Sequence, residues 1–97
     1  MAITYGNHVI YKYPISLAGS HKVIKVKMPF GAQLLGVQVQ NERIVVWAAV
    51  NEDVEIVTRR FWVLGTGWRI PEGIALRHLK TLTDDDGYVW HVFEEAS

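Results

Sequence analysis

The sequence of 97 residues predicts an all-β fold, a small antiparallel sandwich or barrel of about six or seven short strands with little or no helix. Glycine, proline, asparagine and aspartate recur at intervals of roughly 8–15 residues, the spacing of short strands joined by tight turns. Between these turns apolar and polar residues alternate, as they do in half-buried strands. We expect a single domain over residues 1–97, with an ordered core over about residues 8–95.

Two strands are expected before residue 30. The first covers residues 9–15, with Tyr11 and Tyr13 facing inward and Pro14 at its end or on a sheet edge, because proline donates no ladder hydrogen bond. The second covers residues 22–28, whose apolar residues share one face while lysines occupy the other. These are Ile24, Val26 and Met28 on one face and Lys25 and Lys27 on the other. Lysines on an edge strand hinder edge-to-edge aggregation.

Residues 34–40 and 44–50 are expected to pair as a hairpin through Asn41-Glu42. In the first of these segments Leu35, Val37 and Val39 share one face. The second segment is apolar on both faces, which favours a central position in its sheet.

Three further segments follow. Residues 54–64 form the longest strand candidate, and residues 88–94 form another. Residues 74–82 are ambiguous, because their leucines lie three residues apart and also fit one or two helical turns. Nearby threonines and the Asp86-Gly87 turn favour a strand that pairs with residues 88–94, and we expect a strand.

Composition narrows the classes of function. Ten basic and ten acidic residues balance, which argues against general binding of nucleic acids or membrane surfaces. The absence of cysteine excludes disulfides, thiolate metal sites and thiol nucleophiles. The histidines lack metal-ligand spacing, and nothing places an acid to orient a Ser–His pair. We therefore expect no metal, no cofactor and no catalysis.

The N-terminus lacks a basic-then-apolar signal and no apolar run reaches about 18 residues, which indicates a soluble, cytoplasmic protein.

Arg59 and Arg60 are adjacent in a predicted strand, so they must point to opposite faces. An arginine on a buried face needs a carboxylate or another anion, because an unpaired buried charge is very costly. A guanidinium group also binds phosphate through two parallel hydrogen bonds. The alternative is a solvated charge at a strand end, stacked over Trp62 as a cation–π pair.

The segment Gly65-Thr66-Gly67-Trp68-Arg69 is the most unusual in the chain. Glycines permit close backbone approach, and consecutive N–H groups can form an anion-binding nest. Trp68 would stack on a flat ring and Arg69 would hold a phosphate. The alternative is a bulged turn in which Trp68 closes one end of the core.

Two other features have a structural interpretation. His91 lies between Val89 and Phe93, where a hydrogen-bonded core imidazole is expected. The run of aspartates before Gly87 reads as a solvated hairpin turn, since a calcium loop needs alternating ligands and a distant glutamate. The candidate ligand-binding residues are Arg59, Arg60, Trp62, Gly65, Thr66, Gly67, Trp68, Arg69 and His91.

Aromatic residues are too numerous for the expected core. A chain of this length buries only about 60–65% of its extended-chain surface, yet it contains four Trp, four Tyr and three Phe. Some of these rings should lie at the surface, where a large apolar patch marks an interface. Self-association would offset the small core.

Several motifs in order resemble a family of short proteins encoded by tailed bacteriophages and prophages. They are Tyr11-Lys12-Tyr13, Met28-Pro29-Phe30-Gly31-Ala32, residues 34–40, Trp47-Ala48-Ala49-Val50, Arg60-Phe61, Gly65-Thr66-Gly67 and His91-Val92-Phe93-Glu94. The resemblance implies a phage origin and action in the cytoplasm of the infected bacterium. It brings no activity or catalytic residue with it.

Two functions remain open. The first is a non-catalytic, oligomeric "sponge" that sequesters a nucleotide-like immune signal of the host, held by the arginines and stacked on Trp68 or Trp62. The second is a protein-interaction module that docks an aromatic surface onto a host protein and modulates it. An enzyme built from His91, Thr66 and carboxylates ranks third, because no residue spacing requires one.

Overall fold

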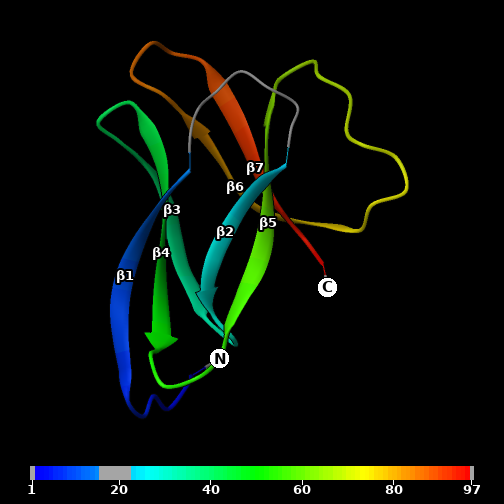
Figure 1. Ribbon diagram of the computed structural model, residues 1–97. Coiled ribbons are helices and arrows are strands. Elements are labelled where there is room, and N and C mark those ends of the chain that lie inside the picture. Colours follow the sequence, from blue (N-terminus) through cyan, green and yellow to red (C-terminus); the bar gives the residue numbers. More distant parts are fainter. Residues whose placement is uncertain (1, 16–22, 97) are drawn as a thin grey trace.

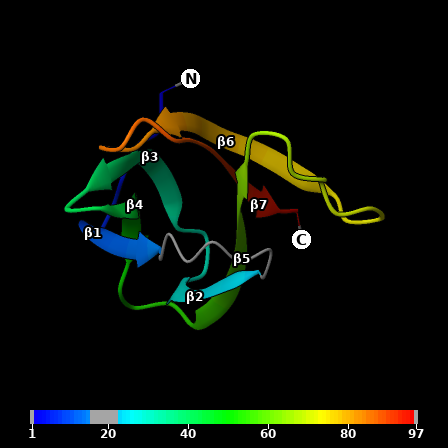
Figure 2. The same cartoon turned by 90° about the horizontal axis from the view of Figure 1, so that it is seen from above.

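Seven strands form two antiparallel sheets in the computed structural model, which describes residues 2–15 and 23–96. They are β1 (His8–Ile15), β2 (Ile24–Pro29), β3 (Gln33–Gln40), β4 (Arg43–Asn51), β5 (Ile56–Gly65), β6 (Leu76–Thr83) and β7 (Val89–Glu95). The sheets have the orders β1-β4-β3 and β2-β5-β7-β6 and face each other (Figure 1; Figure 2). The described residues contain no helix, so the all-β prediction is confirmed and residues 76–83 are a strand. Residues 2–15 and 23–96 accordingly contain no helix that is long and apolar enough to cross a membrane.

The core lies between the two sheets and draws apolar side chains from every strand except β6, whose Leu79 and Leu82 pack against it while partly exposed. Its largest fully buried side chains are Phe61, Ile15, Met28, Ile44, Val46, Val50 and Val92. The inward residues of β2 and β5 follow the period of two that the sequence shows. Burial of these side chains is the main force that holds the two sheets together.

The hairpin at Asn41-Glu42 is confirmed. Both residues have positive φ, 52° and 64°, which is the backbone of a two-residue type I′ turn. It joins β3 to β4, and β4 is the central strand of its sheet. Val45 and Ala49 on its outer face are buried and Trp47 beside them is half-buried, which agrees with the prediction from its two apolar faces.

The predicted alternation of β3 is wrong at Leu35. The pairing of β3 with β4 shifts between Leu34 and Gly36, so one extra residue is inserted and the side chains before it change face. Leu34 therefore packs against the core and Leu35 is 48% exposed. A second shift, between His78 and Lys80, interrupts β6 in the same way.

The inward placement predicted for two tyrosines holds for one of them. Tyr13 packs against the core. Tyr11 is 42% exposed, and its hydroxyl donates a hydrogen bond to the Glu52 carboxylate, which raises the pKa of Tyr11. The physical reason is that the first half of β1 is exposed on both faces, so alternation along this strand does not bring burial.

Candidate functional site

Arg59 and Arg60 lie on opposite faces of β5, as predicted. The Arg59 side chain enters the inner face and is 20% exposed. Arg60 is exposed on the outer face, at the register position opposite Lys25 of β2. Only Arg59 therefore needs the buried counter-charge that the sequence argument requires.

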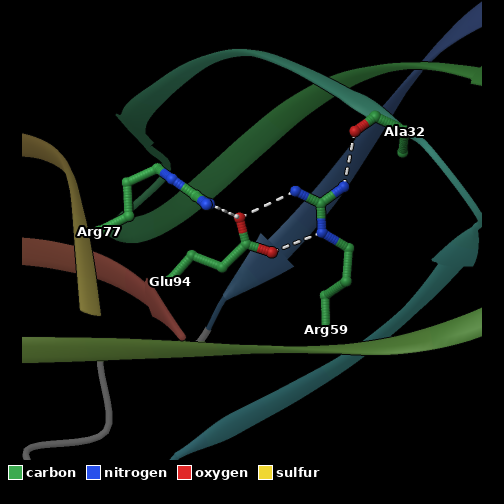
Figure 3. A network of polar contacts seen from close by, with 4 residues as sticks. All are labelled: Ala32, Arg59, Arg77 and Glu94. Atoms are coloured by element: carbon green, nitrogen blue, oxygen red, sulfur yellow. Dashed lines mark hydrogen bonds and ion pairs between the residues drawn. The ribbon is translucent and has the colours of Figure 1, made fainter. Parts of the chain in front are cut away.

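Glu94 is that counter-charge, and it was not among the residues predicted from the sequence. It lies on the inner face of β7 and is 4% exposed. Its carboxylate accepts hydrogen bonds from Arg59 Nε at 2.5 Å and Nη2 at 2.8 Å, and Arg77 Nη1 lies 3.6 Å from Oε1 (Figure 3). Arg59 Nη1 also donates to the carbonyl of Ala32 at 2.6 Å. No buried side-chain nitrogen or oxygen in the described residues lacks a partner.

A pocket of about 460 Å³ opens beside this ion-pair network. Arg60, Arg77 and Phe30 line it together with the network, and Phe30 is 63% exposed. The pocket also contains the carboxylates of Glu94 and Glu95. Two of its three guanidinium charges are therefore balanced, and the excess positive charge is small.

The Gly65–Trp68 segment is a turn at the end of β5, and its Trp68 packs on Trp90, a half-buried residue beside the core. Trp68 N–H donates to the carbonyl of Gly65 at 3.1 Å, and Gly67 has φ of 90°. The Trp68 indole packs edge-on against Trp90, with ring centroids 5.6 Å apart, and lies against Gly65 so closely that a Cβ there would be 2.8 Å from Cε2. The segment is thus a turn, as in the alternative interpretation, although the pairing of β5 with β7 shows no register shift up to Gly65.

Thr66 and His91 belong to a chain of four hydrogen-bonded side chains. Thr66 Oγ1 lies 2.9 Å from His91 Nε2, and His91 Nδ1 lies 3.0 Å from Thr81 Oγ1. Thr81 Oγ1 is also 2.9 Å from His78 Nε2. His91 is hydrogen-bonded, as predicted, but its predicted place in the core is wrong. It is half-buried and lies on the face of β7 opposite the core residue Val92, because successive side chains of a strand point to opposite faces. No group of three histidine or carboxylate side chains that could hold a metal ion occurs in residues 2–15 and 23–96.

The candidate residues do not converge on one cavity. Arg59 and Arg60 line the pocket beside Glu94, whereas the Gly65–Trp68 turn lies toward the opposite end of β5. Trp62 donates its indole N–H to Glu95 Oε2 at 2.9 Å. Arg69 is exposed in the loop after β5.

A groove that runs across the three-stranded sheet to Leu79 and Lys80 of β6 was not predicted from the sequence. We call it the Trp47 groove; its volume is about 630 Å³, and its apolar lining comes from Ile10, Leu34, Leu35, Val37, Trp47 and Leu79. Trp47 donates its indole N–H to Gln38 Oε1 at 3.2 Å, and Lys12 Nζ lies 5.8 Å from the ring centroid. Ile10 is 64% exposed. The two apolar faces of residues 44–50 were the available signal, since one of those faces had to be the outer face of the sheet.

Comparison with known proteins places the chain in a family without assigning an activity. No curated protein and no solved structure matches it. A family model described as a domain of unknown function, DUF7352, matches residues 7–97, which include all seven strands. The chain therefore belongs to the DUF7352 family.

Proposed function

We propose that this protein is a phage-encoded, non-catalytic binding protein that self-associates and acts in the cytoplasm of the infected bacterium by docking its Trp47 groove onto a host protein. The phage origin rests on the order of the sequence motifs described above. The docking function rests on one observation, the open groove around Trp47, in which Ile10 and Leu35 are exposed.

The composition of the groove supports a protein partner. Ile10 and Leu35 are 64% and 48% exposed beside Trp47, and grouped exposed apolar side chains mark interaction surfaces. Trp47 is held by Gln38 and Lys12 before binding, and a pre-positioned tryptophan loses little conformational entropy on docking. Lys80 lines the groove and Lys12 lies over the Trp47 ring. The fitting partner is therefore an apolar surface with acidic residues at its edge.

The test is capture from host lysate with three forms of the protein: wild type, Leu35→Lys and Ile70→Lys. Leu35 lines the groove, whereas Ile70 is a matched exposed residue, 58% accessible, in the loop after β5. We expect one stoichiometric partner that wild type and Ile70→Lys retain and Leu35→Lys loses. Titration of the purified partner should show at least a tenfold weaker affinity for Leu35→Lys, which is about 1.4 kcal/mol. Equal binding by all three forms would remove the groove as the docking site.

A second candidate is a sponge for an anionic, nucleotide-like host signal. The observation that favours it is the pocket lined by Arg59, Arg60, Arg77 and the exposed ring of Phe30. Guanidinium groups bind phosphate and an exposed ring stacks a base. It ranks second because Glu94 and Glu95 line the same pocket.

Calorimetry with cyclic di- and trinucleotides and cyclic ADP-ribose isomers tests the sponge. Binding heat that disappears in Arg60→Ala supports it, since Arg60 makes no ion pair whose loss would disturb the described fold. The absence of heat for every compound, measured on folded protein, removes it.

A further inference from the structure

The four strands at the sheet edges differ in how well they are protected. β3 and β6 each contain a bulge, and β2 alternates Lys25 and Lys27 before it ends at Pro29. Bulges, lysines and proline are the devices that prevent edge strands from pairing with other chains. β1 pairs with β4 over eight residues without a register shift, and its protecting residues, Lys12 and Pro14, lie in its second half.

The direction of the β1 backbone groups follows from the hairpin. Residues that flank a two-residue hairpin loop form a hydrogen-bonded pair, here Gln40 and Arg43. Hydrogen-bonded pairs alternate along β4, so Val45 and Trp47 bond to β3, whereas Ile44, Val46, Ala48 and Val50 bond to β1. Their partners in β1 are Val9, Tyr11, Tyr13 and Ile15.

The even-numbered residues of β1 therefore turn their N–H and C=O groups away from the sheet. They are His8, Ile10, Lys12 and Pro14. Pro14 fits this arrangement because it has no N–H to offer β4. The N–H of His8 bonds to the carbonyl of Gly6 at 3.0 Å. β1 lies at the margin of the molecule in Figure 1, where no other described strand runs along its outer side.

The side chains of β1 leave apolar surface exposed on both faces. Val9 is 38%, Ile10 64% and Tyr11 42% exposed.

We propose that two copies of this chain pair through β1, antiparallel and about a twofold axis beside Ile10, to form one six-stranded sheet. In this register Ile10 faces Ile10 of the second copy, and Lys12 faces His8, so no two lysines are opposed. Val9 faces Tyr11 of the second copy, which covers the exposed residues of the inner face. Pro14 stays beyond the paired segment. These features favour a second copy over an unrelated strand, because the segment is complementary to itself.

The pairing would join the two Trp47 grooves across Ile10. The inference deepens the self-association in the proposed function, and its test uses no host protein, so a failed capture experiment leaves it untouched. Conversely, a monomer that still binds its host partner through Leu35 would overturn the pairing and the self-association, and would leave the docking function standing.

The experiment is light scattering or sedimentation equilibrium of wild type, Ile10→Pro and Ile10→Ala over a range of concentrations. Both substitutions replace the large isoleucine side chain with a smaller one, but only proline removes the outward N–H. We expect wild type at about twice 11.0 kDa, Ile10→Ala as a weaker dimer, and Ile10→Pro as a folded monomer with dimerisation at least tenfold weaker than that of Ile10→Ala. Near-ultraviolet circular dichroism checks the fold of each variant.

Two results would overturn the proposal: a wild-type monomer at every concentration, or a folded Ile10→Pro variant that dimerises as strongly as Ile10→Ala. If Ile10→Pro does not fold, Lys12→Pro takes its place, with Lys12→Ala as its control. Lys12 turns its N–H outward in the same way, and the same two outcomes apply to it.

Discussion

Arg59 and Glu94 face each other across β5 and β7, joined by two hydrogen bonds of 2.5 Å and 2.8 Å at one end of the core. A third bond, from Arg59 Nη1 to the Ala32 carbonyl, ties the pair to the turn between β2 and β3. An ion pair at this depth is tolerated because every polar atom in it is bonded. The pair thus connects the four-stranded sheet to the segment that leads into the other sheet.

Removing one partner of this pair should destabilise the fold strongly. Glu94→Ala leaves the Arg59 guanidinium without its counter-charge, and we expect a loss of about 3 kcal/mol in the free energy of unfolding. Urea denaturation measures this free energy.

The double variant Arg59→Met with Glu94→Leu should have a free energy of unfolding close to that of wild type, since a well-packed apolar pair often stabilises a fold as much as a buried ion pair does. Arg77→Ala is the control: Arg77 is 61% exposed, so its loss should cost less than about 1 kcal/mol. A double variant as unstable as Glu94→Ala would contradict this account.

Gly65→Ala should displace Trp68. The added Cβ would lie 2.8 Å from Cε2 and 3.0 Å from Nε1 of the indole, closer than unbonded atoms approach, and overpacking of this kind costs about 1–3 kcal/mol. Thermal unfolding and tryptophan emission report the loss and the movement of the ring. Gly36→Ala is the matched control, because its Cβ would meet nothing within 4 Å. Unchanged stability and emission in Gly65→Ala would show that the turn holds Trp68 less tightly than we infer.

Asp84 should make stability depend on pH. Its carboxylate accepts the indole N–H of Trp90 and the backbone N–H groups of Asp86 and Tyr88, all at 2.9 Å. These bonds, that from Trp90 foremost, lower the pKa of Asp84 from its ordinary value of 3.8. A lowered pKa in the folded protein means that the Asp84 carboxylate binds a proton more tightly in the unfolded chain than in the folded one. The stabilisation by Asp84 is therefore fully present above pH 3.8 and is lost as the pH falls through the folded-state value.

The check is the difference in unfolding free energy between wild type and Asp84→Asn as a function of pH. Wild type should be the more stable at neutral pH, and the difference should shrink under acid conditions. Asp85→Asn serves as the control, since Asp85 is an exposed neighbour in the same turn. A difference that stays constant with pH would rule out the Asp84 carboxylate as its source.

His78 and His91 should adopt the same tautomer when both rings are neutral. Thr81 has one hydroxyl proton and contacts His78 Nε2 and His91 Nδ1, so it donates to one ring and accepts from the other. If it donates to His91 Nδ1, both rings carry the proton on Nε2; if it donates to His78 Nε2, both carry it on Nδ1. Nitrogen-15 NMR of the imidazoles reads the tautomers. Thr81→Val should uncouple them, whereas Thr81→Ser should preserve the coupling.

Local patterns in the sequence were sufficient for the strands, the Asn41-Glu42 hairpin and the opposite faces of Arg59 and Arg60. Each of these depends on neighbours in the chain: alternation places side chains, and turn residues set φ. The same patterns failed at Leu35, because the pairing of β3 with β4 contains a bulge there. A bulge is one extra residue in a strand relative to its partner, so the alternation within a single strand cannot predict it.

The sequence by itself therefore determined the all-β class, the position of the central strand β4 and the need for a counter-charge at whichever of Arg59 and Arg60 lies on a buried face. Only the tertiary structure decided that Glu94 supplies this charge, that Trp68 packs on Trp90, and that Trp47 lies in an open groove. The physical reason is that these contacts join residues far apart in the chain. Which of them meet depends on which strands become neighbours and in what register, and that is settled by the packing of both sheets together.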